Sequence, residues 1–126
     1  MTGTRYRNSV FQHLLCGGPA GSGCTIVEDL LAFDHALRSG KLVSKAMLDR
    51  MWRAYPEKSS PTYGYGFRIF PAPVGRAVGH RGGFASISAD FLVYLDAGYT
   101  LAVLSNYGSG APPVSHEIQN LVGRKD

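Results

Sequence analysis

The stretch GHRGGFASISADFLVYLDAGYTLAVLSN, residues 79–106, decides the fold class. From residue 86 to residue 95, side chains alternate between two faces, which predicts a strand. One face carries Ile87, Ala89, Phe91, Val93 and Leu95, and the other carries Ser86, Ser88, Asp90, Leu92 and Tyr94. Asp96-Ala97-Gly98 closes a hairpin. Residues 99–105, YTLAVLS, then form a strand that is apolar on both faces and needs cover on both sides.

Upstream of this hairpin, the sequence predicts two helices. Thr25-Ile26-Val27-Glu28 matches a capping box, in which the Thr25 hydroxyl and the Glu28 carboxylate cap each other's backbone. The first helix therefore covers about 25–39, and Gly40 ends it in the left-handed conformation. Ser44 caps the second helix, which ends at Pro56.

The remaining elements complete an α-α-β-β-β-β-α order. Residues 65–70 alternate as a strand, in which we expect Tyr63, Tyr65 and Phe67 to pack, and a second strand begins at 76–80. A helical stripe through Val114 ends the chain at Gly123. The predicted architecture is α+β, an antiparallel meander with packed helices. We expect residues 1–15 to be loosely ordered and residues 16–126 to form a single domain.

Composition excludes several classes of protein. The 126 residues carry a formal net charge of +4, and the pI is about 9.3. The basic residues form no stripe with interleaved aromatic side chains, which argues against nucleic-acid binding. No apolar run is long enough to span a membrane, and the N-terminus lacks the apolar region of a signal peptide. The compartment stays open, with the cytoplasm as the default.

The two cysteines do not form a recognisable framework. Cys16 and Cys24 could pair across a short loop, but we expect two ordinary buried thiols. Together with His13 they lack the spacing of a zinc site. We therefore expect no metal and no cofactor.

One short segment of the sequence carries a candidate catalytic motif. The chain has no Gly-x-Ser-x-Gly elbow and no Ser-x-x-Lys, and its Tyr-x-Asn match, Tyr6-Arg7-Asn8, lies in the irregular N-terminal segment. What remains is His80-Arg81-Gly82-Gly83 at the mouth of a strand. A histidine there can exchange a proton near neutral pH, and glycines let a substrate approach the backbone. An unpaired backbone N–H of an edge strand can stabilise an oxyanion. Taken alone, this segment is better explained as a tight turn with a polar, solvated histidine than as a catalytic site.

The chain resembles the C-terminal portion of the serine β-lactamase-like hydrolases, which include penicillin-binding proteins, class C β-lactamases and related esterases. The resemblance covers about residues 8–123. Three segments and the closing amphipathic helix carry it: GGPAGSGCTIVEDLLAFDHALRSGKLVS, YGYGF and GHRGGFASISADFLVYLDAGYTLAVLSN. It implies a partial β-lactamase or transpeptidase fold.

The resemblance also implies roles for residues 80–83. In this family the third active-site motif is Lys-Thr-Gly or His-x-Gly, and His80-Arg81-Gly82 matches the second form. His80 would polarise the site, and the Gly83 backbone N–H would be one oxyanion donor. Arg81 would meet a substrate carboxylate or point to solvent. Ser86 stands where many relatives carry a second glycine, which leaves open whether the turn keeps the family shape.

Three functions follow as hypotheses. The first is a truncated or split serine hydrolase, inactive alone because a serine activated by lysine is absent from the sequence. It would take a small acyl substrate only if a complementary chain supplied the other half. The second is an interaction module that forms a homo-oligomer or binds a partner through an uncovered sheet face and edge. The third, with little support, is a small ligand-binding domain that uses Arg81.

Overall fold

The structure is a computed structural model that describes residues 17–19, 21–58, 61–72 and 74–123. Its centre is one antiparallel sheet with the strand order β1-β2-β3-β4. The strands are β1 (Arg68–Ala72), β2 (Gly75–Phe84), β3 (Ile87–Tyr94) and β4 (Thr100–Ser105). Each strand pairs with its neighbour in sequence, which confirms the predicted meander and the α+β class.

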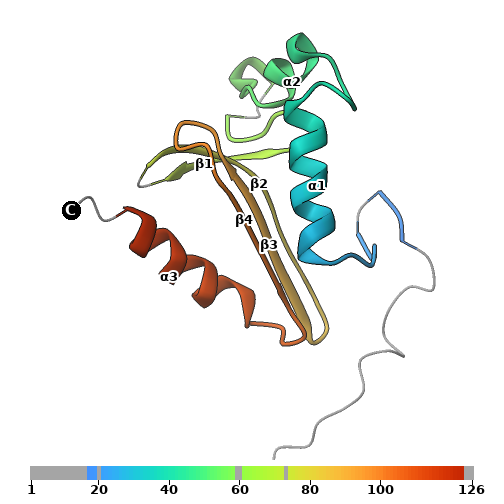
Figure 1. Cartoon of the computed structure of the whole chain (residues 1–126), viewed down its shortest axis with the longest axis vertical. Coiled ribbons are helices and arrows are strands. Elements are labelled where there is room, and N and C mark those ends of the chain that lie inside the picture. The colour runs from blue at the N-terminus through green and yellow to red at the C-terminus, as the bar shows by residue number, and fades with distance from the viewer. Residues whose placement is uncertain (1–16, 20, 59–60, 73, 124–126) are drawn as a thin grey trace, which may run out of the picture.

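Helices cover both faces of the sheet (Figure 1). Helix α1 (Val27–Arg38) lies on one face and α3 (Ala111–Gly123) lies on the other. The short helix α2 (Lys45–Met51) packs beside α1, and one 3₁₀ turn, η2 (Pro56–Lys58), leads toward β1. Both α1 and α3 contact β4, so the strand predicted to need cover on two sides has it.

Each sheet face has its own apolar core. On the α1 face, Val78 and Val93 are fully buried against residues of the two helices and the loop before β1, namely Leu37, Leu48 and Phe67. On the α3 face, Ala77, Leu92, Tyr94 and Leu101 pack with Ile118 of α3. Because side chains alternate along β2 and β3, each one faces either the α1 side or the α3 side of the sheet.

The start of α1 differs from the predicted capping box. The N-cap is Ile26, no side chain caps the helix, and the Thr25 hydroxyl donates instead to the Ile26 carbonyl at 3.3 Å. The prediction was wrong because the N-cap is Ile26, one residue after Thr25. The Thr25 hydroxyl therefore lies too far from the first turn to cap it. At the other end, Gly40 has φ +76°, which confirms the left-handed stop.

Several other helix and strand boundaries differ by a few residues from those predicted from the sequence. Ser44 accepts a hydrogen bond from the Met47 N–H at 3.2 Å, as predicted for the cap of α2. The first strand begins at Arg68, so Tyr63 and Tyr65 precede it and are exposed, contrary to the packing predicted for them. Helix α3 begins at Ala111, before two prolines that suit its first turn because they need no donor there.

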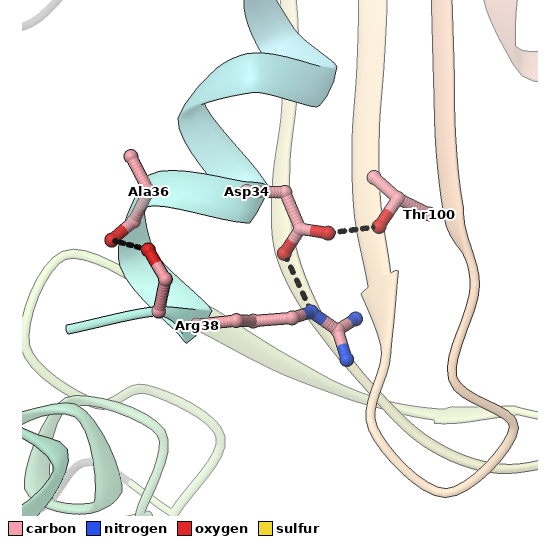
Figure 2. A network of polar contacts seen from close by, with 5 residues as sticks. Asp34, Ala36, Arg38 and Thr100 are labelled. Atoms are coloured by element: carbon pink, nitrogen blue, oxygen red, sulfur yellow. Dashed lines mark hydrogen bonds and ion pairs between the residues drawn. The ribbon is translucent and has the colours of Figure 1, made fainter. Parts of the chain in front are cut away.

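A buried carboxylate attaches α1 to the sheet (Figure 2). Asp34 is 3% exposed. Its Oδ1 accepts from Arg38 Nε at 2.8 Å, and its Oδ2 accepts from the Thr100 hydroxyl of β4 at 2.5 Å. Both carboxylate oxygens are therefore hydrogen-bonded, as a buried charge requires.

Cys24 is a free and exposed thiol, so the expectation that it is buried was wrong. It lies in the irregular segment before α1, which no element covers. Cys16, Tyr6-Arg7-Asn8 and the predicted loosely ordered segment 1–15 lie outside the described residues. No helix in the described part of the chain is long and apolar enough to span a membrane.

Candidate active site

The segment His80–Gly83 lies where β2 continues beyond the end of β1. Strand β1 pairs only with Gly75 to Gly79, whereas β3 pairs with β2 as far as Phe84. Among the described residues, no strand lies along the β1 side of β2 after Gly79. The predicted motif therefore sits on an open backbone edge.

The hairpin between β2 and β3 sets which backbone groups face that edge. Phe84 and Ile87 flank a two-residue turn, so they form a hydrogen-bonded pair. Backbone direction alternates along a strand, so His80 and Gly82 also hydrogen-bond to β3. The N–H and C=O groups of Arg81 and Gly83 consequently point to the open edge, which is the direction an oxyanion donor needs.

His80 projects to the α1 face of the sheet. It lies opposite Phe91 in the strand register, and the Phe91 ring is 6.0 Å from that of Phe33 in α1. His80 Nε2 is 2.6 Å from Tyr63 Oη, and the two rings meet edge to face at 5.4 Å. No local sequence pattern predicts this pair, because the two residues lie 17 positions apart.

A cleft of about 560 Å³ opens beside this pair. Its walls are the glycine-rich segment before α1, the first turns of α1 and the far half of the sheet. The residues that line it include Gly21, Thr25, Leu30, Tyr63, His80, Arg81, Gly82, Phe91 and Leu104. An alanine Cβ at Gly82 would meet no atom within 4 Å, so the backbone there is open to a ligand.

Arg81 projects to the opposite face from His80. Its Nε lies 3.5 Å from Asp90 Oδ2, and its guanidinium lies over the Phe70 ring, 5.2 Å from the ring centroid. Asp90 is 1% exposed, so Arg81 offsets a buried charge. Recognition of a substrate carboxylate by Arg81 stays a prediction, and it would require Arg81 to leave Asp90.

The Arg81–Asp90 pair adjoins two stacked tyrosines, the buried Tyr94 and the half-buried Tyr99. Burial, followed by the neighbouring Tyr99, raises the pKa of Tyr94 to about 12. Burial also raises the pKa of Tyr99, whose ring stacks on that of Tyr94 at 4.4 Å. Both hydroxyls therefore stay neutral through the physiological range.

Ser86 keeps the turn in a conformation that glycine favours. Its φ is +64°, one of two positive values at non-glycine positions in the described residues. This costs a serine about 1 kcal/mol. The departure from glycine therefore places strain in the turn and leaves the β2–β3 register intact.

The fold and site define an α+β protein in which β2 extends beyond β1 and carries a His-x-Gly motif beside a cleft. The family model described as Beta-lactamase matches residues 2–122, and the chain belongs to this family. Penicillin-binding protein 4* of Bacillus subtilis is 33% identical over 89 residues. That match covers 68% of this chain and 20% of the relative, so the chain spans about a fifth of the relative's length.

The described residues offer no metal centre. Within them, no three His, Cys, Asp or Glu side chains gather in a way that could hold a metal ion. The polar groups beside the cleft include the His80 imidazole and the Tyr63 hydroxyl that contacts it.

Proposed function

We propose that this chain supplies the sheet wall of an acyl-transfer site in a β-lactamase-like serine hydrolase. It is a truncated or split form that is inactive until another segment provides the nucleophile. The observation that carries the proposal is the extension of β2 past β1, which leaves the edge of His80–Gly83 open beside a cleft. Membership of the Beta-lactamase family, matched over residues 2–122, supports it.

Each residue then has a defined role. A serine hydroxyl from the complementary segment attacks the acyl carbonyl while a base of that segment takes its proton, and the carbonyl oxygen becomes an oxyanion. The oxyanion then collapses, the bond to the leaving group breaks, and the leaving group takes up that proton. The Gly83 N–H is one donor to that oxyanion, and Gly82 gives the substrate room to reach it. His80 orients and polarises the site from the α1 face.

The test places this chain in the Bacillus relative in exchange for its matching segment. The hybrid should hydrolyse a chromogenic ester or a cephalosporin, whereas the isolated chain should turn over neither and should not react with a serine-directed probe. In the hybrid, His80→Ala should lower kcat/KM about 100-fold. The matched control is His116→Ala, which should leave kcat/KM unchanged. His116 is an exposed histidine of α3, which covers the other face of the sheet.

Two results would contradict the proposal. One is stoichiometric labelling of a serine in the isolated chain together with turnover that survives His80→Ala. The other is a folded, active hybrid in which His80→Ala and His116→Ala behave alike.

An interaction module is the second candidate, and exposed apolar side chains at the N-cap and in the first turns of α1 favour it. Ile26, Val27 and Leu31 are 57%, 41% and 45% exposed, and Leu104 on the edge strand β4 is 39% exposed. Such a surface suits a second copy of this chain or a complementary chain. Sedimentation velocity should show concentration-dependent association that Leu31→Glu weakens at least tenfold. A monomer at the highest concentration, without binding of an exposed-hydrophobe dye, would exclude this candidate.

A further inference from the structure

The contact between Tyr63 and His80 joins two segments that the fold holds rigidly. The Gly64 N–H donates to the Phe67 carbonyl at 2.8 Å, and the Ile69 N–H donates to the Thr62 carbonyl at 2.8 Å. Tyr63 also bridges to Arg68, which pairs with Gly79, the residue before His80. These backbone contacts hold the main chain of Tyr63 next to β1 and β2, and from there its hydroxyl reaches the imidazole.

Close packing of this loop on α2 restricts it further. The Tyr65 N–H donates to the Met51 carbonyl at 3.1 Å. Gly64 is buried, and a Cβ on it would lie 1.9 Å from the same carbonyl oxygen. Tyr63 thus stands on a loop with little freedom, although its side chain is exposed.

We infer that Tyr63 is a positioning residue that holds neutral His80 in the tautomer with its proton on Nδ1. The 2.6 Å contact joins Oη to Nε2, and a phenol is a better donor than acceptor, whereas an imidazole nitrogen accepts well. Tyr63 therefore donates to Nε2, and the ring proton resides on Nδ1. Neutral His80 then acts toward a ligand as a hydrogen-bond donor from Nδ1 and not as a base through Nε2.

This inference refines the role that the proposed function gives His80, but it concerns a property of the isolated chain. Protonation of His80 would reverse the bond, since Nε2–H would then donate to the phenol oxygen. The ring orientation is therefore the same in both charge states. A hydrolytic site would gain a donor whose direction does not change when protons move around it.

The test is a ¹H–¹⁵N NMR correlation of the histidine rings at alkaline pH, where an imidazole is neutral. The chain has four histidines, so the His80→Gln variant identifies the His80 signals. The expected spectrum shows the Nδ1–H pattern for His80. Tyr63→Phe, which removes only the hydroxyl, should shift the tautomer ratio about tenfold toward Nε2–H.

Tyr65→Phe is the matched control, because Tyr65 is an exposed tyrosine two residues away that stacks on Tyr55. It should leave the His80 pattern unchanged. An Nε2–H pattern in the unaltered chain, or an unchanged pattern in Tyr63→Phe, would overturn the inference. Either result leaves the proposed hydrolase function intact, since the hybrid enzyme tests that function separately.

Discussion

Replacing Gly79 with alanine should lower the free energy of unfolding by at least about 3 kcal/mol. A Cβ at this position would lie 1.9 Å from the Phe91 carbonyl oxygen and 3.0 Å from Leu92 Cα. Both partners are backbone atoms of the central strand β3, so no side-chain rotation relieves the contact. The strands β2 and β3 must separate, which breaks ladder hydrogen bonds next to His80. Urea denaturation followed by circular dichroism measures the loss.

Gly82→Ala is the matched control on the same strand. A Cβ there meets no atom within 4 Å, and alanine suits a strand better than glycine by about 0.5–1 kcal/mol. This variant should therefore unfold at the same urea concentration as the unaltered chain, or at a slightly higher one. Equal midpoints for Gly79→Ala and Gly82→Ala would show that the two strands do not approach as closely as described.

Local signals predicted the sheet well. Strand alternation and the turn at Asp96-Ala97-Gly98 depend on a few neighbouring residues, and the structure places β3 and β4 on either side of that turn. The start of α1 was harder to predict. Whether Thr25 caps a helix depends on where the preceding loop enters it, and packing against the sheet decides that.

For the candidate site too, local motifs point to some residues, and others are found only in the folded structure. A motif of adjacent residues points to His80 and Gly83, whose catalytic roles stay a prediction. Tyr63, in contrast, reaches His80 only because β1 pairs with β2 in a particular register. The sequence did contain a signal for Asp90, since alternation placed it on the same face as Leu92 and Tyr94. Asp90 can be recognised as a buried charge that holds Arg81 only once the structure shows that α3 covers this face.

Removing the Asp34 carboxylate should have the second large effect. Asp34→Ala removes the hydrogen bond from Thr100 that ties α1 to β4, and it leaves Arg38, which already has one buried nitrogen without a partner, less satisfied (Figure 2). Hydrogen bonds to charged groups contribute about 1.5–3 kcal/mol each, but Arg38 is 30% exposed and partly hydrated. The free energy of unfolding should therefore fall by about 2–3 kcal/mol, measured by urea denaturation.

A second ion pair of identical spacing separates the effect of burial from that of charge. Lys45 and Asp49 of α2 also meet at 2.8 Å, four residues apart, but their side chains are 78% and 59% exposed. Asp49→Ala should cost at most about 0.5 kcal/mol. Thr100→Val should cost about 1–1.5 kcal/mol, since it removes only the link between helix and sheet. If Asp34→Ala cost no more than Asp49→Ala, Asp34 would not be the buried attachment of α1, and apolar packing alone would hold that helix against the cleft.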